Sequence, residues 1–205
     1  MLEVGCGTGY VSAAIERDCP NIALTSAELF IRGASLAATR LQRAQVIQAD
    51  ARALPFESEF DVAGAFDVIE HIDDDRRVLQ QMYTSLRPGG GLLITVPQHP
   101  WLWREIDEFS HHKRRYTREE LRGKTEGAGF TVTRCTSFVT LLLPVMVASR
   151  PRSRQTVDRE RQMKLPAPIN AGFRFVMDFE RVLIQAGASF PVGGSLLLVA
   201  TKPSA

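Results

Sequence analysis

The sequence has few of the features that mark secreted, disulfide-bonded or membrane-spanning proteins. It contains three cysteines, Cys6, Cys19 and Cys135, and they form neither a CxxC pair nor a metal-ligand spacing. This scarcity argues against a disulfide framework and against a structural zinc site. The first residues lack the basic and apolar regions of a signal peptide, and no run of about 18 apolar residues occurs. We therefore expect a soluble, cytoplasmic protein.

The sequence also lacks an excess of charge of either sign. Lys and Arg number 25 and Asp and Glu number 23, which gives a formal net charge of +2. This balance argues against nucleic acid as a partner of the whole surface. With 205 residues, of which 44% are hydrophobic, the chain can bury one substantial core. We expect a single domain that spans residues 1–205.

Apolar patterning predicts strands that alternate with helices. Strands are expected at residues 2–4, 22–27, 44–48, 60–69, 92–96, 130–138 and 193–202. Helices are expected at residues 10–18, 30–43, 73–86, 117–127 and 169–186, with RPGGG breaking the chain before the fifth strand. Thr117 and Glu120 form the T-x-x-E pattern that opens a helix. The alternation predicts an α/β fold with a doubly wound, seven-stranded, mostly parallel sheet.

Residues 138–168 interrupt this pattern between the last two strands. The segment joins the apolar run FVTLLLPVMVA to the basic run RPRSRQTVDRERQMK and is broken by prolines. We expect a cap-like insert within the domain, whose Leu and Met content favours an apolar substrate. The apolar stretch followed by basic residues also suits peripheral contact of residues 138–164 with an anionic membrane surface.

A glycine-rich loop directly follows the first expected strand, in MLEVGCGTGY. Gly5, Gly7 and Gly9 give GxGxG, whereas the dinucleotide fingerprint has its third glycine one position later, where this sequence has Tyr10. The difference disfavours a nicotinamide-dependent enzyme. Glycines here allow a tight turn and a close approach of the backbone to a ligand, although a simple tight turn would use them too.

Several motifs in order resemble those of the class I S-adenosylmethionine-dependent methyltransferases. LEVGCGTGY resembles motif I, FDVIEHI the fourth-strand motif and LRPGGGLLITVP the entry to the fifth strand. The acid that ends the second strand in that family is matched by Glu28, and the acid after the third strand by Asp50. The resemblance covers nearly all of residues 2–137 and the final strand. Within this class, the sequence is similar to the Rossmann-like ubiquinone-pathway, type 11 and type 23 methyltransferases.

The resemblance implies S-adenosylmethionine as the cofactor and assigns residues to it. Glu28 would bind the ribose hydroxyls, Asp50 the adenine amino group and Glu3 the ammonium end of the methionine. From the residues alone, Glu28 could equally be an acid in the first turn of a helix, and Asp50 a turn residue. The expected cofactor-binding residues are Glu3, Gly5, Gly7, Gly9, Glu28, Asp50, Ala51 and Phe66.

Two histidines and a tyrosine are the expected substrate-side groups. Methyl transfer is an in-line displacement that depends mostly on positioning, and it needs a base where the acceptor carries a weakly acidic proton. His71, His112 and Tyr116 are the catalytic candidates. Glu70 and His71 are also consistent with a role in shaping the cofactor pocket. Trp101, Trp103 and Phe109 are expected near an apolar pocket.

The same region holds a set of possible metal ligands. Asp67, Glu70, His71 and one of His111 or His112 offer carboxylates and imidazoles. The set is similar to the ExxEH motif with a distant His of small-RNA 2′-O-methyltransferases, but Asp67 replaces the first Glu and shortens its reach. The sequence leaves metal binding open, and we assign no metal from it.

Together these features predict an enzyme that methylates a small-molecule or lipid-like acceptor, at oxygen. Two alternatives stay open: a non-catalytic module that binds S-adenosylmethionine, with a regulatory role, and an RNA methyltransferase. Members of the family carry helices before motif I that this sequence does not hold, so we expect reduced stability and a more open cofactor site. The acceptor and the oligomeric state are not specified by the sequence.

Overall fold

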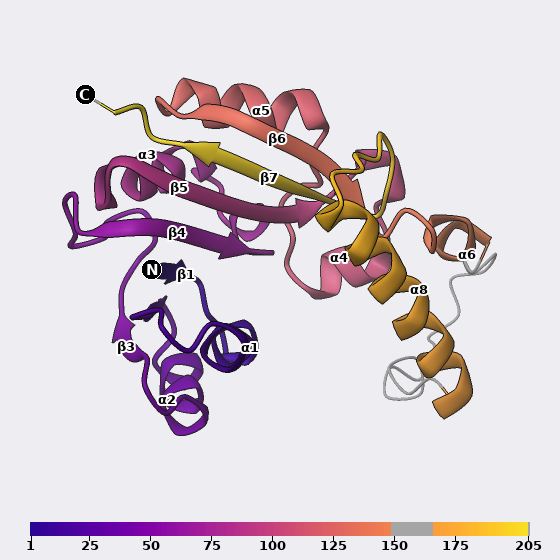
Figure 1. The fold of residues 1–205 in the computed structure, drawn as a ribbon, viewed down its shortest axis with the longest axis horizontal. Coiled ribbons are helices and arrows are strands. Elements are labelled where there is room, and N and C mark those ends of the chain that lie inside the picture. Colours follow the sequence, from indigo (N-terminus) through magenta and orange to yellow (C-terminus); the bar gives the residue numbers. More distant parts are fainter. Residues whose placement is uncertain (149–165, 205) are drawn as a thin grey trace. The chain divides into compact units, whose positions relative to one another are not determined.

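A computed structural model describes residues 1–148 and 166–204, and these residues contain a sheet of seven strands (Figure 1). The strand order is β3-β2-β1-β4-β5-β7-β6. The strands are β1 (Leu2–Val4), β2 (Thr25–Glu28), β3 (Gln45–Gln48), β4 (Phe60–Phe66), β5 (Leu86–Pro97), β6 (Thr131–Phe138) and β7 (Ser195–Thr201). The predicted α/β fold with a seven-stranded, mostly parallel sheet is confirmed.

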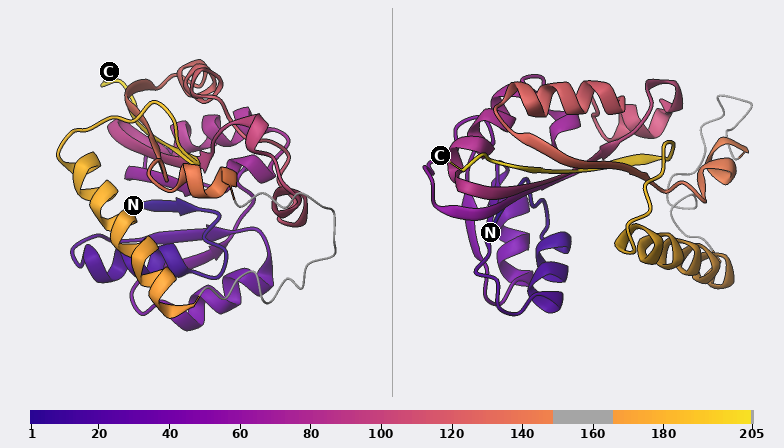
Figure 2. Two further views of the ribbon diagram at one scale, coloured as in Figure 1. Left: turned by 90° about the vertical axis from the view of Figure 1, so that its right-hand side faces the viewer. Right: turned by 45° about the horizontal axis from the view of Figure 1, so that its top comes forward.

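Helices and short 3-10 turns connect these strands. The helices are α1 (Tyr10–Asp18), α2 (Ile31–Arg40), α3 (Asp75–Ser85), α4 (Glu105–Phe109), α5 (Arg118–Gly127), α6 (Leu143–Ala148) and α8 (Ala167–Gln185), with 3-10 turns η1 (Ile69–His71) and η2 (Pro100–Leu102). In the sheet unit, α1 packs with α2 and α3 packs with α5. Figures 1 and 2 show the first pair on one face of the sheet and the second pair on the other.

The short strand β1 lies in the middle of the sheet and pairs in parallel with two neighbours. Leu2 to Val4 align with Thr25 to Ala27 of β2 and with Ala63 to Ala65 of β4. All three residues of β1 are buried. The pairs β2–β3 and β4–β5 are also parallel, whereas Figure 1 shows β7 running opposite to β5. The carboxyl ends of β1 to β5 therefore meet at one edge of the sheet.

Contacts between residues divide the chain into two compact units. One unit comprises Met1–Cys135 with Leu196–Ala205, and the other comprises Thr136–Ser195. The second unit contains α6 and α8, and the buried Oε2 of Glu180 there accepts hydrogen bonds from the N–H groups of Thr140 (2.9 Å) and Leu141 (2.8 Å). The expected cap-like insert, residues 138–168, falls within this unit.

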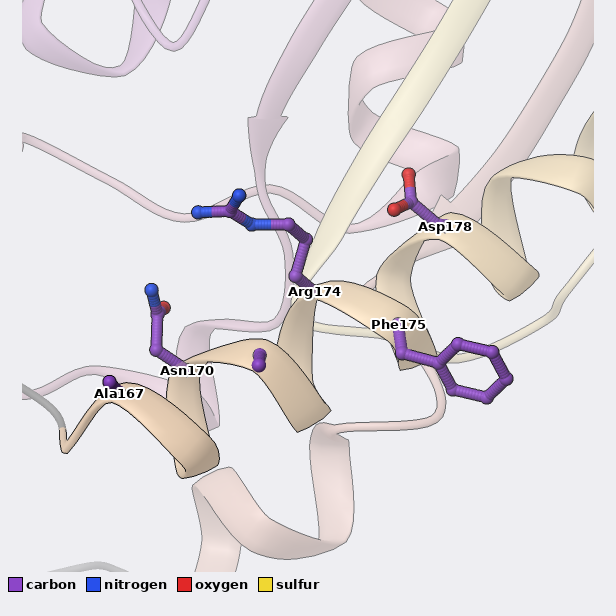
Figure 3. Close-up of a pocket in the computed structure, with 6 residues that line it drawn as sticks. Ala167, Asn170, Arg174, Phe175 and Asp178 are labelled. Carbon is purple, nitrogen blue, oxygen red and sulfur yellow. The ribbon is translucent and has the colours of Figure 1, made fainter.

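The structure describes only the two ends of that insert. Residues 149–165 lie outside the described residues, and so do the basic residues of the expected membrane contact at 138–164. Along α8, a hollow is lined by one helix alone, and Figure 3 shows Asn170 and Arg174 projecting to one side of it and Phe175 to another. Across residues 1–148 and 166–204, no helix is long and apolar enough to cross a membrane.

The expected break at RPGGG is wrong, because these residues belong to β5. The strand begins at Leu86, opposite Phe60, and the next aligned pair joins Val62 to Gly91, so an irregularity absorbs the extra residues. Gly89 adopts φ +78°, a conformation that residues with a Cβ rarely accept. The glycine run therefore forms a bulge inside a strand.

One further strand end and one helix differ from the prediction. The expected strand 60–69 ends at Phe66, because Asp67 adopts φ +53° and the 3-10 turn η1 begins at Ile69. Helix α4, which the aperiodic segment before Tyr116 did not predict, forms at Glu105–Phe109. The expected start of α5 is confirmed, since the Thr117 hydroxyl accepts a hydrogen bond from the N–H of Glu120 at 3.1 Å.

Residues 98–116 form an excursion that leaves β5 and returns to it. Gln98 and Tyr116 form a parallel bridge, the N–H of His99 donates to the Tyr116 carbonyl and the N–H of Tyr116 donates to the Pro97 carbonyl, both at 2.9 Å. The two ends of the excursion are thereby fixed beside the carboxyl end of β5.

A charged cluster in the protein interior anchors the returning end of this excursion. The carboxylate of Asp75, in the first turn of α3, accepts hydrogen bonds from Tyr116 Oη (2.7 Å), Arg114 Nη1 (2.9 Å) and Lys124 Nζ (2.5 Å). Burial raises the pKa of the Asp75 carboxyl, but Lys124, Tyr116 and Arg114 together outweigh burial and hold it below the ordinary value. Asp75 therefore joins α3, α5 and the excursion in one network.

We expect removal of this network to destabilise the fold. Asp75→Asn should lower the free energy of unfolding by about 2 to 3 kcal/mol, because two cations lose a buried partner. Tyr116→Phe should lower it by about 1 to 2 kcal/mol, since one hydrogen bond to a charged group is lost. Urea denaturation followed by circular dichroism measures both changes. Asp61→Asn, which removes the exposed ion pair with Arg87, is the matched control and should stay within about 0.5 kcal/mol.

The same network sets a pH dependence of stability. The folded pKa of Asp75 lies below the unfolded value of about 3.9, so its contribution is complete above that value and is lost as the pH falls through the folded pKa. The stability difference between the parent and Asp75→Asn should therefore shrink on acidification below about pH 4. A difference that stays constant from pH 7 to pH 3 would contradict this assignment.

Candidate active site

The glycine loop after β1 turns sharply at the carboxyl edge of the sheet. Gly5, Gly7 and Gly9 adopt φ values of +73°, +55° and +80°. A Cβ at Gly5 would lie 2.5 Å from Cγ1 of Val68, so only glycine fits there, whereas a Cβ at Gly7 would meet nothing within 4 Å. The loop is thus packed on one side and open to a ligand at Gly7, which fits the cradle that the sequence predicts.

Glu28, the last residue of β2, holds this loop in place. Its Oε2 accepts a hydrogen bond from the N–H of Gly7 (2.8 Å) and its Oε1 accepts one from the N–H of Phe30 (2.9 Å). The side chain is largely buried, with 7% of the residue exposed. The carboxylate therefore lies beside the open part of the glycine loop, as a group that binds ribose hydroxyls would have to.

Glu3 lies beneath the loop in a small buried polar cluster. Its carboxylate accepts a hydrogen bond from Ser12 Oγ, which lies 3.0 Å from Ser26 Oγ. Burial raises the pKa of Glu3, and the hydrogen bond from Ser12 opposes that rise. Burial and the nearby carboxylates of Glu3 and Glu28 raise the pKa of Cys6 to about 11, so its thiol stays protonated at neutral pH.

The remaining predicted cofactor residues lie at the ends of β3 and β4. Asp50 binds Arg52 in a two-pronged ion pair, with Nη2 to Oδ2 at 2.7 Å, and these bonds lower its pKa. Ala51 is buried in the main core, and Phe66 is partly buried at the end of β4. The structure brings these residues and the glycine loop to the same edge of the sheet, and their roles toward a cofactor stay predictions.

A second group of side chains gathers after β4. Glu70 and His71 come from η1, and His112 comes from the excursion, whose Lys113 N–H donates to the Glu70 carbonyl at 2.8 Å. The rings of His71 and His112 lie with centroids 4.7 Å apart in an edge-to-face arrangement. Two of the three predicted catalytic residues therefore lie together.

Asp107, which sequence reasoning did not single out, orients His112. Its Oδ1 lies 2.8 Å from Nδ1 of His112 and accepts a hydrogen bond from Nε of Arg115 (2.8 Å), while its Oδ2 accepts one from the N–H of Arg104 (2.8 Å). Burial raises the pKa of Asp107, but Arg115, Arg104 and His112 outweigh burial and lower it. No spacing in the sequence relates this acid to His112, because α4 was not predicted.

Glu70 stands out because its carboxyl group is buried without a hydrogen-bond partner among the described residues. The residue is 0% exposed, and within the described part of the chain neither oxygen has a hydrogen-bond partner. Burial and the neighbouring Asp67 raise its pKa to about 8. Burial and the adjacent His112 lower the pKa of His71, so its imidazole is neutral at neutral pH.

Tyr116 contradicts its expected place on the substrate side. The residue is 0% exposed, and its hydroxyl donates a hydrogen bond to Asp75 inside the core. Burial and Asp75 raise its pKa far above the ordinary value. A side chain enclosed in this way cannot reach an acceptor, and Tyr116 serves the anchor network instead. His111 and Asp67 both lie exposed and do not belong to the group formed by Glu70, His71 and His112.

Comparison with known proteins shows the family to which the chain is related. The methyltransferase domain family matches residues 1–134. A malonyl-acyl-carrier-protein O-methyltransferase of Enterobacter lignolyticus is 33% identical over 62% of this chain and 53% of its own length. A ubiquinone biosynthesis O-methyltransferase of Psychrobacter arcticus is 31% identical over 64% of this chain and 58% of its own length.

A solved structure shows that the fold is shared beyond these relatives. The phosphoethanolamine N-methyltransferase 2 of Haemonchus contortus, in complex with S-adenosyl-L-methionine, superposes with a TM-score of 0.65 and 20% identity over 100% of this chain and 48% of that one. This chain spans about half the length of the curated relatives that it matches. On the strength of the family match over residues 1–134, the chain belongs to the methyltransferase domain family.

Proposed function

We propose that this chain binds S-adenosylmethionine and transfers its methyl group to a hydroxyl oxygen of a small-molecule or lipid-like acceptor. The observation that carries the proposal is the glycine loop, open at Gly7 and fastened to β2 through Glu28. The two relatives named above as O-methyltransferases support oxygen as the acceptor atom. Because the chain spans about half of their length, activity and acceptor are both part of the proposal.

The cofactor side of the proposal uses residues at the ends of the first four strands. A carboxylate has about four acceptor positions, so Glu28 can bind ribose hydroxyls while the N–H groups of Gly7 and Phe30 keep it oriented. Asp50 can accept from the adenine amino group beside its contact with Arg52. The proposed set is Glu3, Gly5, Gly7, Gly9, Glu28, Asp50, Ala51 and Phe66.

The acceptor side uses His71 and His112. When bound, S-adenosylmethionine supplies a methyl group on a sulfonium, whose sulfur keeps the electron pair of the broken C–S bond. As the new O–C bond forms, the acceptor hydroxyl releases its proton, and the neutral imidazole of His71 is suited to take it up. Asp107 fixes the ring of His112 beside it. Correct positioning of the acceptor hydroxyl relative to the methyl group accounts for the rest of the rate enhancement.

Exposed aromatic side chains support an acceptor with apolar parts. Trp101, Trp103 and Phe109 lie on the excursion that carries His112, and 54%, 36% and 52% of these residues are exposed. Large apolar side chains that remain exposed near polar groups are typical of ligand-contacting surfaces. They favour an aromatic or lipid-like acceptor over a fully polar one.

Removal of the Glu28 carboxylate should weaken cofactor binding. In titration calorimetry with S-adenosylmethionine and S-adenosylhomocysteine, Glu28→Ala should weaken both affinities by about a hundredfold, because a charge-assisted contact is lost and the glycine loop is released. Glu28→Gln retains an acceptor for the loop and should lose about tenfold. Glu59→Ala, at an exposed acid after the third strand, should bind as the parent does.

Thermal unfolding without ligand separates binding from folding in these variants. If Glu28→Gln melts with the parent and still binds S-adenosylmethionine equally well, Glu28 does not contact the cofactor. If the parent itself binds neither ligand, the proposal fails for this chain.

Turnover should depend on His71 and His112 but not on His111, which is adjacent to His112 in the sequence. His71→Asn removes the proposed base, and His112→Asn removes the ring that packs against it. Each should lower the rate of S-adenosylhomocysteine formation with phenolic, quinone-precursor or lipid hydroxyl acceptors by about a hundredfold, while the affinity for S-adenosylmethionine stays unchanged. His111→Asn is the matched control, since His111 is exposed and Asn tolerates its φ of +58°. Equal loss in His112→Asn and His111→Asn would contradict a specific role for His112.

A further inference from the structure

We propose that Glu70, His71 and His112 form a binding site for a divalent transition-metal ion such as Zn²⁺. One ligand atom from each residue lies within 4.8 Å of the other two. Two imidazoles and one carboxylate are donors that Zn²⁺, Co²⁺ and Fe²⁺ accept. Of the ligands that the sequence suggested, the set omits Asp67, and it takes His112 as the second histidine instead of His111.

The distances are close to those of a bound ion. Nε2 of His71 lies 4.0 Å from Oε1 of Glu70, and the two imidazole rings are in edge contact. With bonds of about 2.1 Å, two ligand atoms on a tetrahedral ion lie about 3.4 Å apart. An inward rotation of the side chains by less than an ångström or so would therefore close the site.

Glu70 provides an independent reason for a cation at this position. Its carboxylate is fully buried, and among the described residues neither oxygen has a hydrogen-bond partner. Buried polar groups in native proteins nearly always have hydrogen-bond partners, because an unsatisfied buried polar group costs free energy. The nearby guanidinium of Arg115 is bonded to Asp107 and to the Gln98 carbonyl. A metal ion between the imidazoles would supply the missing partner.

Asp107 prepares His112 to be a ligand. A carboxylate that accepts from Nδ1–H leaves the lone pair on Nε2 for a metal, and such carboxylate–histidine pairs are common around metal ions. Asp107 is itself held by Arg115 and by the N–H of Arg104. The ring orientation is therefore fixed by residues that do not touch the ion.

Backbone hydrogen bonds hold the two segments together. The N–H of Lys113 donates to the Glu70 carbonyl at 2.8 Å, and the N–H of His112 donates to the Asp107 carbonyl at 2.9 Å. The η1 turn and the end of the excursion thus meet without the metal. An ion would bind to a preformed site and would not have to assemble it.

Three protein ligands leave at least one coordination position open, as catalytic metal sites do. A hydroxyl at that position would have a lowered pKa, so an acceptor could lose its proton to solvent before methyl transfer, with His71 acting as ligand instead of base. This consequence deepens the proposed function and rests on it, whereas binding of the ion does not. It favours acceptors whose hydroxyl can reach a metal, such as phenols and catechols.

The test is a metal titration of the untagged full chain after treatment with a chelator. Co²⁺ should bind with one equivalent and give visible d–d absorption, and Zn²⁺ should displace it. His71→Asn, His112→Asn and Glu70→Gln should each lose at least about a hundredfold in affinity. Asp107→Asn should lose about 10- to 100-fold, because it only orients a ligand.

His111→Asn is the control and should bind Co²⁺ as the parent does. Absence of a Co²⁺ spectrum in the parent, or equal binding by His112→Asn, would overturn the proposed metal site. Calorimetry with S-adenosylmethionine on the same samples keeps the two proposals apart. If the chain binds the cofactor but no metal, the proposed function stands and the metal site is refuted. If it binds the metal but not the cofactor, the metal site stands and the proposed function is refuted. Circular dichroism confirms that each variant is folded.

Discussion

The parallel pairing of β1 between β2 and β4 is the constraint on which the rest of the site depends. It brings the glycine loop, Glu28 and the turn after β4 to one edge of the sheet. Val68, in that turn, fills the space where a side chain at Gly5 would lie. The loop therefore keeps its shape through packing against the segment that follows β4 as well as through its own backbone.

The two halves of the site are stabilised by different physical means. At the glycine loop, the Glu28 carboxylate accepts hydrogen bonds from the N–H of Gly7 and from the N–H of Phe30, and so joins the loop to the end of β2. At His112, a long excursion from β5 is fixed by buried charges, with Asp75 at its return and Asp107 within it. Hydrogen bonds to charged groups are stronger than neutral ones, which allows an aperiodic segment to hold a defined conformation.

The position of the glycine loop and of Glu28 could be predicted from the sequence more fully than the surroundings of His112. The position of glycines and acids that directly follow strands can be predicted from the sequence, because a parallel sheet places the carboxyl ends of its strands at the same edge. Tyr116 carried the right chemistry for a substrate-side group but is a core residue, and only tertiary packing reveals that. Asp107 was missed because α4 has no apolar period, and its partner His112 lies on a turn. The bulge at RPGGG was misread because Gly and Pro favour turns locally, while pairing with β4 outweighs that preference.

The buried carboxyl group of Glu70 costs folding free energy, and the fold alone does not explain why an acid occupies this position. A glutamine or an apolar residue at this place would avoid the desolvation of a carboxylate, and neighbouring Asp67 adds repulsion. Nothing in the sheet requires an acid here, since the η1 backbone is bonded independently of its side chain: His71 N–H to the Val68 carbonyl and Lys113 N–H to the Glu70 carbonyl. A costly group that the fold does not need is best explained by chemistry at the site. The two imidazoles within reach of Glu70 narrow that chemistry to proton transfer or to metal binding. In proton transfer an imidazole nitrogen has a free lone pair that can accept a proton, whereas in metal binding the lone pair is bound to the ion.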